Sequence, residues 1–485
     1  MLLKGKAVGM ITAQRARLGL VAAAITGVVV VPLTLMTGAR MLRRLGHWLE
    51  PAGSHRLHQP PAPPQQPQPT KTPAVDVVGK LTPGWQASSL GNPALGRYPH
   101  CWQTLARTPW DLEIHAGQLV VGLGNSSNDG VTANAGPVPL FAYDLEGDRW
   151  QQLATLPEEE ISRFSIGDSA LWIAGADARG SWRWGNLYRS SSADGAWWQE
   201  RRLPQFIHVH DLAWHRGELV VVGNVPDAVS TGPQQDRHGS ALGRSSDAGQ
   251  HWVVDRLRGW RATALLPVDD QLFAVQALPG PAQKRWLAVR ERLQTFTAVQ
   301  QWRPDGAWRP RPDLTPEVLL PGVSGAGVRS AWLERSTPSG SAVGWIASLG
   351  PWTSERPQRA AFVASGLKAG APNVQPVALR RGEQAMDLYP SEEGWLLLSS
   401  EPLASGQWLN RIRALTASAL FEAEQMAFPQ PWLSFETPQA PRSLAGDRQR
   451  LFVGLGHPPF QREPSPNSCP AGAKLSGTVL ELRPR

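Results

Sequence analysis

The feature that most constrains this fold is a repeat of paired apolar segments separated by a short turn. Residues 110–125 and 210–225 align without a gap, with Asp-Leu near the start, a glycine in the middle and Leu-Val-Val after it. Two short apolar runs around a glycine-containing turn predict a β-hairpin. Further copies, less regular than these two, occupy residues 386–400, 165–175, 264–275 and 443–454.

The spacing of the hairpins predicts a ring of similar β-sheets. Seven units begin near residues 110, 162, 209, 261, 327, 385 and 441. An interval of about 55 residues suits one four-stranded blade of a β-propeller. The composition agrees, because 47 Gly and 44 Pro favour turns over long helices. We therefore predict an all-β, seven-bladed β-propeller, with six or eight blades as the alternatives.

One segment carries a recognisable turn motif. Ser245, Asp247, Gly249 and Trp252 form the string S-x-D-x-G-x-x-W, and residues 190–198 hold a degenerate copy. This string resembles the Asp-box (BNR repeat) of sialidase-like β-propellers, and the resemblance covers roughly residues 100–485. In that family the box is a structural turn, so the resemblance implies a structural role for these four residues. The chain lacks the Arg-Ile-Pro motif of the sialidases, and we assign no catalytic residue from them.

The two ends of the propeller are expected to meet in one blade. Residues 474–485 have the pattern of a strand, and residues 101–107 are expected to add the outermost strand of the same blade. Cys101 and Cys469 would then lie together, and a disulfide closing so long a loop would contribute about 4–5 kcal/mol. The alternative is two unrelated buried thiols.

The N-terminal part divides into four segments that differ in composition. The apolar run from Leu18 to Met36 has 19 residues without a charge, enough to span a bilayer as an α-helix. We predict an uncleaved membrane anchor, and a cleaved signal peptide ending near Ala39 is the alternative. The predicted segments are a cytoplasmic basic tail (1–17), the anchor (18–36), a juxtamembrane segment (37–59), a proline-rich stalk (60–75) and then the propeller (100–485).

The charge distribution argues against nucleic-acid binding. The chain holds 48 Lys and Arg against 40 Asp and Glu, a net charge of +8. Residues 1–100 hold 11 basic and 2 acidic residues, which leaves 37 and 38 for the predicted propeller. Because its net charge is −1, the propeller lacks the basic surface that a nucleic-acid-binding domain needs.

Acidic residues recur at one position of the repeat. Asp111, Asp211 and Asp387 each begin an Asp-Leu pair on the first strand of a unit, and His210 precedes the second of them. Innermost strands line the channel of a propeller, so these side chains are candidates for binding a cation or a polar ligand. In the alternative interpretation, each aspartate accepts hydrogen bonds from backbone amides of the neighbouring blade. Whether a metal binds stays open, and we expect no cofactor.

These features predict a non-catalytic binding or assembly scaffold for another envelope or membrane protein. The anchor would hold it in the inner membrane, with the propeller in the periplasm or outside the cell. The alternative is a carbohydrate-binding or glycoside-hydrolysing propeller, for which a glycan is the ligand. A pocket lined by several arginines and a Tyr–Glu pair would favour that alternative.

Overall fold

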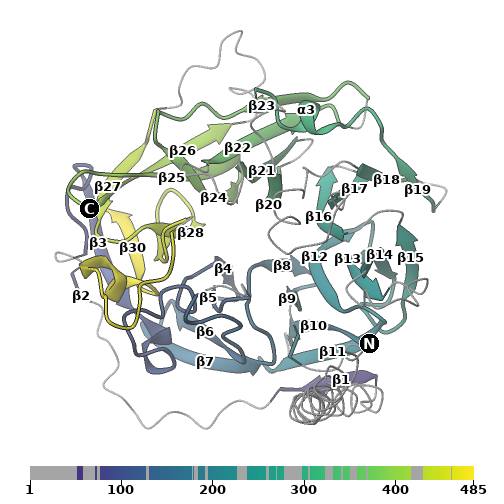
Figure 1. Cartoon of the computed structure of the whole chain (residues 1–485), viewed down its shortest axis with the longest axis horizontal. Helices are drawn as coiled ribbons and strands as arrows, with labels where there is room; N and C mark the ends of the chain where they lie inside the picture. The colour runs from purple at the N-terminus through teal and green to yellow at the C-terminus, as the bar shows by residue number, and fades with distance from the viewer. Residues whose placement is uncertain are drawn as a thin grey trace, which may run out of the picture. The chain divides into compact units, whose positions relative to one another are not determined.

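The computed structural model is a ring of seven antiparallel sheets, which confirms the predicted seven-bladed β-propeller (Figure 1). Innermost strands of successive blades are neighbours around the whole ring, from β4 (Asp111–His115) to β28 (Pro441–Gly446) and back to β4. The structure describes residues 52–57, 72–73, 77–126, 130–176, 178–179, 184–191, 195–226, 238–257, 261–268, 270–277, 298–303, 306–322, 331–339, 342–349, 358–367, 370–416, 430–459 and 461–485.

In six blades the first four strands are consecutive in sequence, and the first strand begins within a few residues of the predicted unit start. Blade 1 comprises β4, β5 (Gln118–Gly122), β6 (Val138–Asp144) and β7 (Arg149–Leu156). Blade 2 comprises β8 (Phe164–Gly167), β9 (Ala170–Ala174), β10 (Trp184–Ser190) and β11 (Trp197–Pro204). Blade 3 comprises β12 (His208–His215), β13 (Glu218–Pro226), β14 (His238–Ser245) and β15 (Val253–Leu257).

Blade 4 comprises β16 (Arg261–Val268), β17 (Gln271–Ala277), β18 (Ala298–Trp302) and β19 (Trp308–Pro310). Blade 5 comprises β20 (Ala331–Ser339), β21 (Ala342–Leu349), β22 (Gln358–Ser365) and β23 (Asn373–Pro376), preceded by the short helix α3 (Pro316–Leu319). Blade 6 comprises β24 (Gln384–Ser391), β25 (Gly394–Pro402), β26 (Trp408–Thr416) and β27 (Leu433–Thr437).

The repeat has a local physical basis in its turns. Ala116 and Gly117 join β4 to β5 with φ of 50° and 74°, and Arg216 and Gly217 join β12 to β13 with φ of 51° and 79°. Two successive positive φ values define the type I′ turn, whose twist matches that of a hairpin. Apolar side chains on both faces of each sheet then pack between blades, as Leu212 and Val221 do with Leu187 and Leu203 of the preceding blade.

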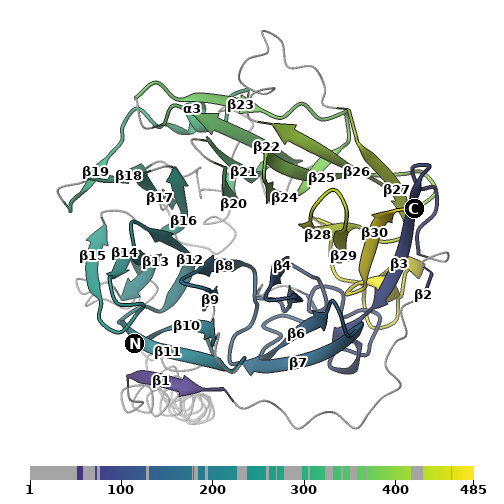
Figure 2. The ribbon, with the colours of Figure 1, turned by 180° about the vertical axis from the view of Figure 1, so that it is seen from behind.

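Blade 7 is built from both ends of the propeller (Figure 2). Its inner strands are β28, β29 (Leu451–Leu455) and β30 (Val479–Pro484), as predicted for the C-terminal strand. The fourth strand is β3 (Trp85–Gly91), which pairs with β30. The expectation that residues 101–107 supply this strand is wrong: they form turns, and the ring begins before the predicted boundary at residue 100.

A disulfide joins Cys101 to Cys469, as predicted, with 5.8 Å between their Cα atoms. The two residues lie on the loop after β3 and on the loop before β30, so the bond fastens the two chain ends that make blade 7. Ring closure therefore combines β-sheet hydrogen bonds with one covalent bond.

Two short strands precede β3. β1 (Gly53–Arg56) pairs with β11 as a fifth strand of blade 2, and β2 (Thr72–Pro73) pairs with β3 in blade 7. The rest of the proline-rich segment lies outside the described residues, as does the predicted anchor Leu18–Met36. No helix within the described residues is long and apolar enough to cross a membrane.

Candidate functional site

The three repeated aspartates are buried between blades. Asp111, Asp211 and Asp387 are 3%, 4% and 0% exposed. Their Oδ2 atoms accept backbone N–H bonds from the innermost strand of the next blade, at 2.7–2.9 Å. The amide donors are Phe164, Leu265 and Leu444, in the same order. This arrangement is the one described by the alternative interpretation of the repeat, in which the aspartates tie blades together.

A backbone irregularity places two of these carboxylates. The pairing of β12 with β13 shifts register between Val209 and Asp211, and that of β24 with β25 shifts between Ala385 and Asp387. A β-bulge turns the following side chain in a new direction. Each aspartate thereby accepts an N–H bond from the residue after it as well as one from the next blade.

Arg163, which immediately precedes β8, adds an ion pair at the centre that the sequence did not indicate. Its Nη1 atom lies 3.1 Å from both carboxylate oxygens of Asp211. Burial raises the pKa of Asp211, and the Arg163 charge and two backbone amides oppose that rise. The carboxylate is thus enclosed by groups from blades 2, 3 and 4.

His210 lies apart from these aspartate contacts. Its Nε2 atom is 3.0 Å from Oδ1 of Asn224 within blade 3, and its ring stacks on that of His208. Nδ1 of His208 is 2.7 Å from the carbonyl oxygen of Ala176, on the loop after β9 of blade 2. Within the described part of the chain, no group of three or more His, Cys, Asp or Glu side chains could hold a metal ion.

A Tyr–Glu pair spans the closing blade. The Tyr389 hydroxyl on β24 of blade 6 donates to Oε1 of Glu113 on β4 of blade 1, at 3.1 Å. Burial, followed by the Glu113 charge, raises the pKa of Tyr389. Blade 7 lies between these two blades, and Tyr389 packs against an apolar cluster that includes Ala445 on β28. Sequence reasoning missed this pair because its members are 276 residues apart.

The segment that resembles an Asp-box forms the turn between β14 and β15. Ser245 Oγ accepts the N–H of Gly249 at 2.7 Å, and Asp247 Oδ1 accepts the N–H of His251 at 2.9 Å. The His251 hydrogen bonds lower the pKa of Asp247. Gly249 has a φ of 86°, which suits glycine, and Trp252 donates from Nε1 to the Gly249 carbonyl. All four residues are engaged in the turn itself, at the periphery of blade 3.

A second buried polar cluster lies between blades 1 and 2. Glu158 is fully buried and accepts hydrogen bonds from the Tyr188 hydroxyl at 2.7 Å and from Nδ2 of Asn186 at 3.1 Å. Burial raises the pKa of Tyr188 well above its ordinary value. A Cβ atom on Gly175 would lie 2.6 Å from the Glu158 carboxylate, so this glycine makes room for it. With Tyr188 and Glu158 both at 0% exposure, this second Tyr–Glu pair is part of the packing between blades.

Comparison with known proteins finds distant structural neighbours only. No protein-family model and no curated protein sequence matches the chain. Similar solved structures include a chain of the mitotic checkpoint complex, at 12% identity and a TM-score of 0.38, over 84% of this chain and 96% of that one. A puromycin hydrolase mutant complexed with PGG is 11% identical with a TM-score of 0.43, over 74% of this chain and 52% of that one.

Proposed function

We propose that this chain is a non-catalytic binding or assembly scaffold, whose propeller recognises another membrane or envelope protein. The proposal is carried by one observation: the ionisable groups at the centre of the ring bind other parts of the ring. Asp111, Asp211 and Asp387 accept backbone amides of the next blade, and Arg163 pairs with Asp211. These groups hold blades together, so the centre is built as a rigid frame that can present its outer surfaces.

The proposed location is the inner membrane, anchored by residues 18–36, with the propeller in the periplasm or outside the cell. The Cys101–Cys469 disulfide supports an oxidising compartment. We also propose kinship with the Asp-box propellers, which the self-contained turn at Ser245–Trp252 supports.

Affinity isolation of the intact chain from detergent-solubilised membranes tests the scaffold. The expected result is a membrane or envelope protein recovered in stoichiometric amount. A matched chain that keeps residues 1–51, before the first strand of the ring, and lacks the propeller should recover none of it. Equal recovery by both chains, or no stoichiometric protein with the intact chain, would contradict the proposal.

The second candidate function is binding or hydrolysis of a glycoside, favoured by the contact between Tyr389 and Glu113. A carboxylate that accepts a hydrogen bond from a phenol can act as the base for a tyrosine nucleophile. The raised pKa of Tyr389 opposes ionisation without that base. Hydrolysis of aryl glycosides by the intact protein, abolished in Tyr389→Phe, would establish this candidate and would end the claim that the scaffold has no activity.

A further inference from the structure

Three loops on one face of the ring are joined into a single structure, which we call the crown. It consists of the described residues 92–105, 130–135, 457–459 and 461–474. The last two loops each connect the second strand of a blade to the third, in blades 1 and 7, so both lie on the same face of the ring. The first loop follows β3 and enters blade 1.

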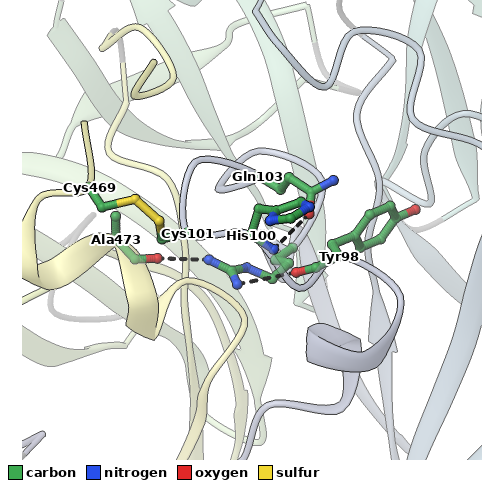
Figure 3. Close-up of a disulfide and its surroundings, with 7 residues drawn as sticks. Tyr98, His100, Cys101, Gln103, Cys469 and Ala473 are labelled. Atoms are coloured by element: carbon green, nitrogen blue, oxygen red, sulfur yellow. Dashed lines mark hydrogen bonds between the residues drawn. A yellow bond between two sulfur atoms is a disulfide. The ribbon is translucent and has the colours of Figure 1, made fainter. Parts of the chain in front are cut away.

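The loops of the crown are held by contacts that are distant in sequence. The disulfide joins the first loop to the third (Figure 3). Glu463 accepts the N–H of Leu105 at 2.9 Å and the hydroxyl of Thr132 at 2.6 Å, which links all three loops. The Tyr98 hydroxyl donates to the carbonyl of Ala135 at 3.1 Å.

A buried arginine donates hydrogen bonds to two loops of the crown. Arg107 is 1% exposed and donates to the carbonyl oxygens of Tyr98 and Ala473, at 3.3 and 2.9 Å. Burial lowers its pKa to about 10, so the guanidinium stays charged at neutral pH. Beside it, Thr104 Oγ1 lies 2.9 Å from Nδ1 of the buried His457. The crown is therefore fixed before any partner arrives, which reduces the entropy lost on binding.

The crown exposes apolar side chains. Leu95 is 46% exposed and Val131 is 48% exposed. Only two other large aliphatic side chains in the described residues are this exposed, Ile166 and Val253, and each stands in a different blade. His100 and Trp102 add a stacked pair, with ring centroids 4.1 Å apart and planes inclined by 8°. Exposed apolar side chains on a structure held by a disulfide and buried hydrogen bonds are typical of protein–protein contacts.

The charge of the crown is positive. Its basic side chains Arg97, Arg462 and Lys474 are exposed. Both carboxylate oxygens of Glu463, by contrast, accept hydrogen bonds from within the crown. With three basic residues against one acidic residue, the net charge of the crown is +2, whereas residues 92–485 as a whole hold 38 basic and 38 acidic residues and have a net charge of 0. A surface of this kind favours an acidic partner.

We infer that the crown is the surface on which the scaffold docks its protein partner, through an apolar patch of that partner bordered by acidic side chains. This inference rests on the proposed scaffold function and adds the place and chemistry of contact. Leu95 and Val131 supply the apolar contact, and Arg97 and Arg462 supply the charge at its border. The disulfide then has a second consequence beyond closing the ring, because it holds the docking surface in shape.

Substitution within the full-length chain tests the inference. In the isolation from solubilised membranes, Leu95→Asp and Val131→Asp should each reduce recovery of the partner about tenfold or more, as expected for an apolar contact at the centre of an interface. Val253→Asp is the matched control, because Val253 is 56% exposed on β15 of blade 3. The control should recover as much partner as the unaltered chain, and all three variants should keep the unfolding temperature and the disulfide.

A photo-crosslinking residue at position 95 or 131 of the full-length chain gives a second readout. Both positions should form an adduct with the same protein, and position 253 should not. An adduct with phospholipid would assign the crown to the membrane surface and overturn the inference. Recovery of a partner that is indifferent to both crown substitutions would overturn it while leaving the scaffold intact. If the unaltered chain recovers no partner, the scaffold function itself fails.

Discussion

Two regions of the ring are held together by different means: the centre, where the innermost strands meet, and the seam, where the crown joins the two chain ends of blade 7. At the centre, one carboxylate per joined pair of blades accepts a backbone amide from the next blade, and the same arrangement recurs with Asp111, Asp211 and Asp387. At the seam, a disulfide, the buried Arg107 and the buried His457 join segments about 350–370 residues apart. The centre thus uses a local device repeated in the sequence, and the seam uses single long-range contacts.

Because each central contact is one of several similar ones, the loss of one leaves the other blade junctions intact. The seam has no repeated counterpart, and it joins the two ends of the propeller. A change at the seam should therefore lower the free energy of unfolding by more than the matching change at the centre.

The largest effect is expected from removing the disulfide. Replacing Cys101 and Cys469 by serine together should lower the free energy of unfolding by about 4–5 kcal/mol, because the unfolded chain regains the entropy of a very long loop. Denaturant unfolding of the full-length protein measures this. Reduction of the unaltered protein should reproduce the loss, and reductant should leave the double variant unchanged. Equal stability of the oxidised protein and the double variant would show that the seam does not depend on this bond.

Acid should weaken the seam. Burial lowers the pKa of His457 to about 4, whereas the unfolded chain protonates it near 6.5. Between these two values the unfolded state binds a proton that the folded state excludes, so stability falls as the pH falls, by about 3 kcal/mol in all. Unfolding measured from pH 7 to pH 4 tests this. His457→Gln should remove most of the slope.

At the centre, protonation of Asp211 should change the free energy of unfolding in the opposite direction. Burial raises the pKa of Asp211 above its ordinary value of 3.8, so in the window between these values the folded state binds more protons than the unfolded state. The stabilising contribution linked to this proton is present below pH 3.8 and is lost as the pH rises through the raised value. The free energy of unfolding should be measured against pH for the unaltered protein and for Asp211→Asn. The difference between the two curves should give the contribution of Asp211. If the Asp211 contribution instead destabilised the protein as the pH falls, as the His457 contribution does, the proposed contrast between centre and seam would be wrong.

Removing one central carboxylate should have a smaller effect than breaking the seam. Asp387→Ala leaves the buried amides of Leu388 and Leu444 without the acceptor that they have now, which should cost about 2 kcal/mol. Asp387→Asn keeps one carbonyl oxygen as an acceptor and should cost about half as much. Denaturant unfolding of both variants measures the two values, and a loss larger than that from the disulfide variant would reverse the proposed ranking.

The regular part of the fold could be predicted from the sequence because its signal is local. Hairpin turns such as Ala116-Gly117 and Arg216-Gly217 repeat with their flanking strands, and this repeat gave the number of blades and their starts. The outer strand of blade 7 was misplaced because the sequence of β3, WQASSLG, has little apolar alternation. Strand β1, GSHR, has none, and it pairs with β11 through its backbone.

The candidate site was predicted less completely, because most of its contacts are not local in the sequence. The recurring aspartates were visible, and both of their roles could be stated from the repeat. Arg163 and the Tyr389–Glu113 pair were not visible, because each contact depends on which side chains the closed ring brings together. The crown was missed because its exposed Leu95 and Val131 lie in loops without periodicity.

The smallest effect is expected at the Tyr389–Glu113 contact, which combines features of both regions. It lies on innermost strands, as the aspartates do, yet it joins residues on either side of the closing blade. Tyr389→Phe removes one hydrogen bond and keeps the ring packing, so it should lower the free energy of unfolding by about 1 kcal/mol. Glu113→Gln in the same background measures the coupling between the two side chains through a double-mutant cycle. A coupling near zero would mean that blade 7 is held between its neighbours by packing and by the crown, with no contribution from this bridge.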